Sequence, residues 1–277
     1  MQEWLTDAVQ TVILYSVIPF FELPAVPIGP FRVQAFSLLT VAGIGAGYIW
    51  LRRRLRRLGE DAAHVPGMVF WILLAGFAGA LALKLLYLPS FVDTLRTAPR
   101  DLLRMVSGIA SFGGLFAGLA SGCIYLRWSG LRGATVMRYL DALAFVFPRA
   151  WLFGRIGCAL AHDHAGIRTQ SWLGVRYPDG TRWDLGLLEV FFTLAYLGLL
   201  AFLDRRKRPN GLYLGLFLCA YAAFRLGLDR LHENPVRYFG WTVDQYGSTA
   251  ALAAGLVVLL AAVRREPASV SHRQIGS

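Results

Sequence analysis

Two arginines inside an apolar run are the residues of this chain with the clearest chemical potential. The stretch Pro148–Gly166, P-R-A-W-L-F-G-R-I-G-C-A-L-A-H-D-H-A-G, carries Arg149 and Arg155. A charge at membrane depth costs about 2.5–3.5 kcal/mol on insertion scales, so such residues usually serve a function. Gly154 and Gly157 bracket Arg155 and let the backbone approach a ligand or another helix closely. The alternative for both arginines is a side chain that snorkels to the membrane surface.

A second set of charged and polar residues lies in three later apolar segments: Glu189, then Tyr221, Arg225 and Asp229, then Asp244 and Gln245. The i, i+4 spacing puts Arg225 and Asp229 on one helix face, where they can pair, and Tyr221 shares that face. A salt bridge that only locks helices together is the alternative. With Arg155 added, we expect two arginines with few acids close to them to leave surplus positive charge, which binds an anion. Arginine binds phosphate through two parallel hydrogen bonds, which favours a phospholipid phosphate.

Two histidines with an aspartate between them follow Arg155: His162, Asp163 and His164. Alternating ligand types in a loop are weak evidence for a metal site, and we expect no metal. An acid–base role at the membrane surface fits a histidine better, because imidazole exchanges protons near neutral pH. The cysteines, Cys123, Cys158 and Cys219, lie far apart in apolar segments, so their spacing indicates neither a disulfide framework nor zinc ligands.

The composition is that of an integral membrane protein with many spans. Hydrophobic residues make up 56% of the 277 residues and charged residues 16%, whereas a soluble domain carries about 25% charged residues. The net charge of +11 would suggest nucleic acid as a partner of a soluble protein. In a membrane protein it reflects arginine-rich cytoplasmic loops beside anionic lipids, so the expected partner is the lipid bilayer and not nucleic acid.

The apolar segments predict an all-α integral membrane protein of about seven transmembrane helices. The predicted spans are residues 31–51, 66–88, 108–126, 139–160, 185–203, 212–231 and 241–263. Residues 9–21 are too short to span comfortably and predict an interfacial helix, with a short spanning helix as the alternative. In the polar loop over residues 161–183, Y-P-D-G at Tyr177–Gly180 predicts the tip of a small hairpin. We expect one membrane domain over residues 1–265 and a polar tail over 266–277.

Basic residues collect on the loops at one end of the predicted spans, above all in Arg52–Arg57 and Arg205–Arg208. The positive-inside rule makes those loops cytoplasmic, with a periplasmic N-terminus and a cytoplasmic C-terminus. Arg155 and Arg225 then lie toward the outer half of the membrane. In the third span, Gly113 and Gly114 suit close helix packing or a broken helix that lines a cavity.

Four stretches together resemble the prolipoprotein diacylglyceryl transferases, a family of seven-span bacterial enzymes. They read S-G-I-A-S-F-G-G-L-F-A-G, G-R-I-G-C-A-L-A-H-D-H-A-G, L-G-L-L-E and G-L-Y-L-G-L-F-L-C-A-Y-A-A-F-R-L-G-L-D-R. The resemblance implies transfer of a diacylglyceryl group from phosphatidylglycerol to the lipobox cysteine of a preprolipoprotein, with a thioether formed and glycerol 1-phosphate released. It further implies the bacterial inner membrane, the signal peptides of preprolipoproteins as partners, and no metal or organic cofactor.

The resemblance also assigns residues. It implies Arg155, Arg225, Glu189 and Asp229 as candidate catalytic residues. His162 joins them as the candidate acid–base histidine from the sequence itself and not from the resemblance. The candidate substrate-binding residues are Tyr221, Gly154, Gly157, Gly113, Gly114, Asp163 and Gly166. The arginines suit the phosphate of the lipid, and Glu189 and Asp229 suit the task of orienting them.

Several positions depart from the family pattern. Phe112 stands where the family has a histidine, Cys158 where it has asparagine, Phe36 where it has a tyrosine and His162 where it has glycine. Either another group accepts the proton, with His162 and His164 nearest in sequence, or the chain is a lipid-binding pseudoenzyme. A small anion or lipid transporter is the remaining alternative, against which the absence of an internal sequence repeat counts.

Overall fold

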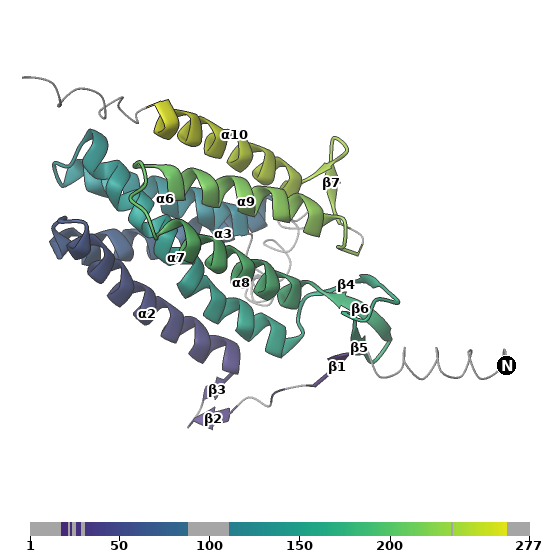
Figure 1. Ribbon diagram of the computed structural model, residues 1–277. Helices are drawn as coiled ribbons and strands as arrows, with labels where there is room; N and C mark the ends of the chain where they lie inside the picture. Colours follow the sequence, from purple (N-terminus) through teal and green to yellow (C-terminus); the bar gives the residue numbers. More distant parts are fainter. Residues whose placement is uncertain are drawn as a thin grey trace, which may run out of the picture. The chain divides into compact units, whose positions relative to one another are not determined.

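The computed structural model describes residues 18–21, 23, 26–28, 31–87, 111–233 and 235–264 (Figure 1). The N-terminal elements are β1 (Ile18–Pro19), β2 (Val26–Ile28), β3 (Phe31–Val33), α2 (Ala35–Arg57), the short 3-10 helix η1 (Ala62–His64), α3 (Val65–Tyr87) and α6 (Ser111–Trp128). Then follow α7 (Gly133–Ala161), β4 (Ala165–Arg168), β5 (Val175–Tyr177), β6 (Gly180–Asp184) and α8 (Leu185–Leu203). The last elements are α9 (Leu212–Asp229), β7 (Arg237–Tyr238), β8 (Trp241–Thr242) and α10 (Val243–Arg264).

Each predicted span coincides with a helix, which confirms the all-α membrane class. Within the described residues, six helical segments are long and apolar enough to cross a membrane: α2, η1 with α3, α7, α8, α9 and α10. The third predicted span corresponds to α6, which has 18 residues. Most of the predicted interfacial helix lies outside the described residues, and its described end, Ile18–Pro19, is a β-strand. The polar tail over 266–277 also lies outside them.

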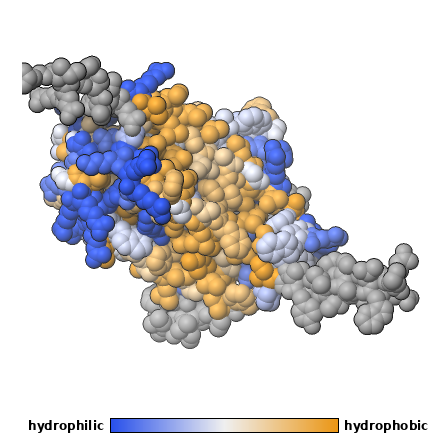
Figure 2. Space-filling model, in the orientation of Figure 1, coloured by the Kyte–Doolittle hydropathy of each residue, from blue (hydrophilic) through white to orange (hydrophobic). Residues whose placement is uncertain are grey.

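Large apolar side chains on the helices are exposed in a way that water would penalise. Val41 on α2 is 69% exposed, Phe70 on α3 59% and Phe202 on α8 60%. Figure 2 shows that hydrophobic residues cover most of the helix surface on the face in view. Apolar surface on this scale marks contact with a partner or with lipid, and helices of this length fit a bilayer. The protein is therefore a multi-pass membrane protein.

The chain forms two compact units. The first combines Met1–Trp50, Val146–Ala201 and Phe224–Gln245, and the second combines Leu51–Phe145, Phe202–Ala223 and Tyr246–Ser277. The single domain expected over residues 1–265 stays a prediction.

In the second unit, glycines let α3 and α6 pack closely. A Cβ added to Gly113 would lie 2.8 Å from the Cβ of Leu83, and one added to Gly114 would lie 3.3 Å from the Gly76 carbonyl oxygen. Both glycines of the predicted substrate-binding pair therefore have a packing role here.

In the first unit, α2 packs against α7, where a Cβ on Gly43 would lie 2.6 Å from the Ala150 carbonyl oxygen. A sheet of order β1-β5-β6-β4 joins β1 from the N-terminal segment to three strands that follow α7. Figure 1 shows β4, β5 and β6 beyond the first turn of α8. Strands β5 and β6 form a hairpin that pairs Tyr177 with Gly180. Gly180 has φ 130°, a value that glycine adopts without strain, and the predicted hairpin tip is confirmed.

Candidate active site

Two arginines from different helices bind the same carboxylate in the first unit. Arg155 Nε on α7 lies 2.5 Å from Glu189 Oε2 on α8. Arg225 NH1 on α9 donates to Glu189 Oε1 at 2.8 Å. The three side chains are between 3% and 11% exposed. The sequence predicted these residues to act together, and the structure brings them into one buried cluster.

Further acids lie around Arg225. Its NH2 group donates to Asp244 Oδ2 at the start of α10. Asp229 accepts from Thr242 Oγ1 at 2.9 Å and from Gln245 Nε2 at 2.8 Å. The prediction of surplus positive charge is therefore wrong, because the carboxylates of Glu189 and Asp244 pair with the two arginines in the described cluster. The i, i+4 spacing along α9 predicted Asp229 as the acid that pairs with Arg225. It could not predict the ion pair with Asp244, because Asp244 lies on another helix.

The contacts of the cluster fix the orientation of the arginines. The guanidinium carbon of Arg155 lies 4.2 Å from the centroid of the Trp151 ring, so the group stacks on an aromatic face while Nε binds Glu189. A guanidinium carries five N–H donors and can hold a carboxylate and a second anion at once. This arrangement can bind a phosphate and stabilise negative charge that develops on it.

The glycines beside Arg155 differ from each other. A Cβ on Gly157 would lie 2.9 Å from the Phe36 Cα, whereas the nearest atom to a Cβ on Gly154 would be Thr40 Oγ1 at 3.9 Å. Gly157 thus serves close packing of α7 on α2, and the space beside Gly154 is open to a small group. Gly166 is also confined, since its Cβ would lie 2.7 Å from the Leu231 carbonyl oxygen.

Phe112 and Tyr221 belong to the second unit. Their ring centroids lie 5.8 Å apart, and the side chains are buried. Phe112 also fills the space beside Gly247, where a Cβ would lie 2.8 Å from the Phe112 Cβ. Phe112 therefore packs the core at the position where the family pattern has a histidine. Tyr221 lies on α9 one turn before Arg225.

A buried histidine, an aspartate and a tyrosine form a second cluster in the first unit. His162 Nδ1 lies 2.6 Å from Asp184 Oδ2, and Tyr177 OH donates to the same oxygen at 3.0 Å. Burial, and then the charge of Asp184, raise the pKa of Tyr177, so its hydroxyl keeps its proton. The sequence predicted His162 as a site residue but missed Asp184 and Tyr177. An aspartate directly before an apolar helix signals an N-cap, which was the one local sign of Asp184.

The remaining histidines near the site differ in environment. Burial, and then the charge of Arg225, lower the pKa of His232 from its ordinary 6.5. His164 Nδ1 hydrogen-bonds Asp163 Oδ1, and both side chains are partly exposed. Ligand-type atoms of Cys158, Asp163 and His164 lie within 4.8 Å of one another. We do not assign a metal to them, since Asp163 and His164 already bond each other, and the expected absence of a metal stays a prediction.

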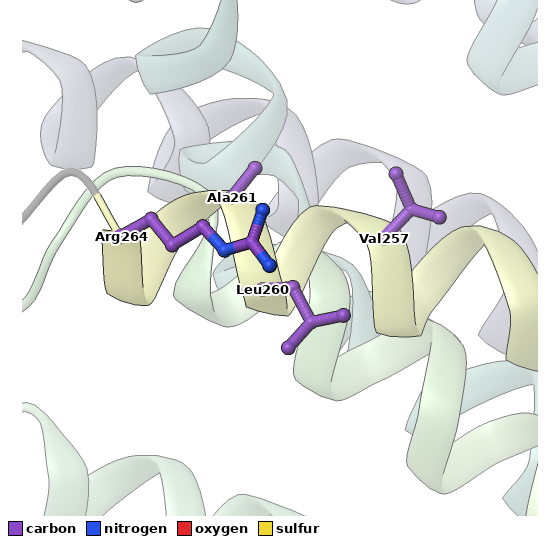
Figure 3. A pocket seen from close by; sticks show the side chains of 4 residues that line it. All are labelled: Val257, Leu260, Ala261 and Arg264. Carbon is purple, nitrogen blue, oxygen red and sulfur yellow. The ribbon is translucent and has the colours of Figure 1, made fainter.

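A depression of about 460 Å³ lies along α10 in the second unit, lined by Val257, Leu260, Ala261 and Arg264 (Figure 3). Its lining consists of apolar side chains and one arginine, none of which can accept a proton. The depression therefore offers no acid–base chemistry. The groups that can bind an anion or accept a proton are those of the arginine cluster and the histidine cluster in the first unit.

Comparison with known proteins agrees with this geometry. The family model for prolipoprotein diacylglyceryl transferase matches residues 24–261. A phosphatidylglycerol–prolipoprotein diacylglyceryl transferase of Methylococcus capsulatus is 32% identical over 264 residues, which cover 90% of this chain and 98% of the relative. Enzymes of the same name from Leifsonia xyli subsp. xyli and Symbiobacterium thermophilum are each 26% identical. These alignments cover 86% and 91% of this chain and 77% and 97% of the relatives. The chain belongs to the prolipoprotein diacylglyceryl transferase family.

Proposed function

We propose that this protein transfers the diacylglyceryl group of phosphatidylglycerol to the cysteine thiol of a prolipoprotein. The products are a thioether-linked lipid and glycerol 1-phosphate. Membership of the family supports the proposal. The observation that carries it is the convergence of Arg155 and Arg225 on opposite oxygens of Glu189, inside apolar helices.

Arg155 and Arg225 bind the phosphate of the lipid headgroup. The contact of Arg155 with Glu189 involves Nε, and the terminal amino groups of a guanidinium are the ones that meet a phosphate bidentately. Glu189 holds the two cations side by side, where they would otherwise repel each other. Asp229 and Asp244 anchor the ends of α9 and α10 around Arg225.

The same arginines serve the chemical step. The sulfur attacks the glyceryl carbon that bears the phosphate ester, and the C–O bond breaks as the C–S bond forms. The electron pair of the C–O bond leaves with the phosphate oxygen, so negative charge grows there. Preorganised cations in a site shielded from water stabilise such charge strongly. The predicted roles of the two arginines thus cover both lipid binding and leaving-group stabilisation.

The second substrate enters from the bilayer through its signal peptide. The end of α2 with Arg52–Arg57 and the loop with Arg205–Arg208 face the cytoplasm. The N-terminus then faces the periplasm and the C-terminus the cytoplasm. In this orientation the hairpin of β5 and β6 is periplasmic, on the side from which secreted lipoproteins are modified.

Transfer by the full-length protein in vesicles tests the function. We expect a peptide with a signal segment and a lipobox cysteine to gain the mass of a diacylglyceryl group in phosphatidylglycerol vesicles but not in phosphatidylcholine vesicles. Arg155→Gln and Arg225→Gln should each lower the rate more than about 100-fold. Arg168→Gln, at an exposed residue of β4, is the matched control and should retain the rate. Product at the wild-type rate from either site variant would contradict the proposal.

A second candidate function is lipid binding without transfer. The observation that favours it is Phe112, which is 1% exposed and packed against Tyr221, and whose ring cannot accept a proton. Complementation separates the two candidates. A transferase restores lipidated lipoproteins to a bacterium depleted of its own enzyme, whereas a lipid-binding protein binds phosphatidylglycerol and leaves lipidation absent.

A further inference from the structure

The histidine cluster has the geometry of an oriented proton acceptor. Asp184 is 1% exposed and holds His162 Nδ1 through Oδ2 at 2.6 Å. The other oxygen of Asp184, Oδ1, accepts from the backbone N–H of Leu187 at 2.9 Å and so caps α8. Tyr177 donates to Oδ2 as well. The carboxylate is thereby fixed on both oxygens, and it fixes the imidazole in turn.

The other ring nitrogen of His162, Nε2, is buried and makes no hydrogen bond within the described residues. A carboxylate only accepts hydrogen bonds, so the bond to Asp184 places the imidazole proton on Nδ1 and leaves a lone pair on Nε2. Leaving a buried polar atom unpaired is unfavourable, and this free energy is recovered when a proton donor binds.

The backbone at His162 is held in an uncommon conformation. Its φ is 48°, in the left-handed region, which is unfavourable for a residue other than glycine. Rings of Phe20, Phe21 and Tyr177 surround the imidazole with centroids 5.1, 4.9 and 6.0 Å away. Strain of this kind persists only where the surroundings enforce it, and it collects at functional sites.

The histidine cluster is connected to the arginine cluster through the first turn of α8. Asp184 directly precedes α8, and Glu189 lies five residues later, about 7.5 Å along a helix axis. A Cβ on Gly186 would lie 3.2 Å from the Ala159 nitrogen, so this turn packs on the end of α7 that carries Arg155. One substrate complex can therefore reach both clusters.

Given the proposed transferase function, we propose that His162 Nε2 accepts the proton of the lipobox thiol and that Asp184 and Tyr177 are positioning residues. The S–H proton moves to Nε2, and the thiolate sulfur forms the bond to the glyceryl carbon. The C–O bond to phosphate breaks, and its electron pair leaves with glycerol 1-phosphate. The imidazolium then releases its proton to water, which returns His162 to its starting state.

Chemical rescue tests the role of His162. His162→Gly suits the left-handed backbone and leaves a space of the size of imidazole. We expect a loss of at least about 100-fold in kcat, with the KM values for peptide and lipid unchanged, and recovery of at least about 10-fold on addition of imidazole. His64→Gly is the control, a partly exposed histidine at the end of η1 in the second unit, and should neither lose the rate nor respond to imidazole.

The positioning role needs a variant that keeps the helix cap. Asparagine caps helices as well as aspartate does, so Asp184→Asn preserves the bond to Leu187 but removes the carboxylate that orients His162. We expect kcat to fall at least about 100-fold at unchanged KM, with a smaller fall for Tyr177→Phe, which removes one of the bonds to Oδ2. A change in KM alone, or a rate equal to wild type, would overturn the positioning role.

The outcomes separate this inference from the function itself. Absence of transfer by the wild-type protein, or full transfer by Arg155→Gln, refutes the proposed function. Full transfer by His162→Gly, or a folded and lipid-binding His162→Gly that imidazole does not rescue, refutes only the assignment of the proton acceptor.

Discussion

Arg155 on α7 and Arg225 on α9 contact opposite oxygens of one buried carboxylate, that of Glu189 on α8. Three apolar helices thus share one cluster of charged side chains, which would be unfavourable if they faced lipid without partners. The arrangement explains how two cations can remain close together before the substrate arrives, because the shared carboxylate offsets their repulsion.

Replacement of Glu189 should destabilise the protein as well as inactivate it. Glu189→Gln leaves two buried guanidinium groups without their shared charge, and breaking a buried ion pair costs about 3–5 kcal/mol. Glu233→Gln is the control, since Glu233 is 50% exposed in its pair with Arg182, and such pairs contribute about 0–1 kcal/mol. Thermal unfolding in detergent measures both variants. Equal unfolding midpoints for the two would contradict the central place of Glu189.

The two glycines beside Arg155 should respond differently to alanine. Gly157→Ala forces a methyl group against the Phe36 backbone, and overpacking of this kind costs about 1–3 kcal/mol. Gly154→Ala meets no atom closer than 3.9 Å and should unfold no earlier than wild type. If substrate occupies the open space beside Gly154, that variant loses transfer without losing stability. A stable Gly157→Ala protein would contradict the close contact of α7 with α2.

Acid should destabilise the protein through His232. Burial and Arg225 lower its pKa below the ordinary 6.5, so the unfolded chain takes up a proton at a higher pH than the folded chain does. The stability due to neutral His232 is present above pH 6.5 and is lost as pH falls through the folded-state pKa. Unfolding midpoints measured from pH 8 to pH 5 should fall more steeply for wild type than for His232→Gln. Parallel curves would refute the coupling.

The membrane orientation can be tested with cysteines in a background without the natural ones. Trp172 is 67% exposed in the loop before β5, and Arg206 is exposed in the loop after α8. A membrane-impermeant maleimide should label Trp172→Cys on intact spheroplasts and Arg206→Cys only after lysis. The reverse pattern would show that the predicted orientation is wrong.

The spans, the hairpin and the pairing of helices at small residues were predictable because they depend on local patterns. Apolar length predicts a span, and Y-P-D-G predicts the turn at Gly180. The sequence predicted that Arg155, Glu189 and Arg225 act as a group. Charged residues at membrane depth are rare, and they usually pair with one another. The mutual geometry of the three residues depends on helix packing and required the structure.

The rest of the site depends on contacts between distant segments. Asp244 binds Arg225 from α10, and no spacing rule relates those segments. Asp184 reaches His162 only because the β5–β6 hairpin returns the chain to the end of α7. The balance of charge was predicted wrongly for the same reason, since Asp244 was not expected to pair with Arg225.

Lipid retained by the purified protein tests the central claim most directly. Native mass spectrometry of the full chain from mixed phosphatidylglycerol and phosphatidylcholine should show bound phosphatidylglycerol on wild type and on Arg168→Gln. Arg155→Gln and Arg225→Gln should each lose that lipid, because both guanidinium groups around Glu189 are needed to hold one phosphate. Retention of phosphatidylglycerol at the wild-type level by both site variants would contradict the account.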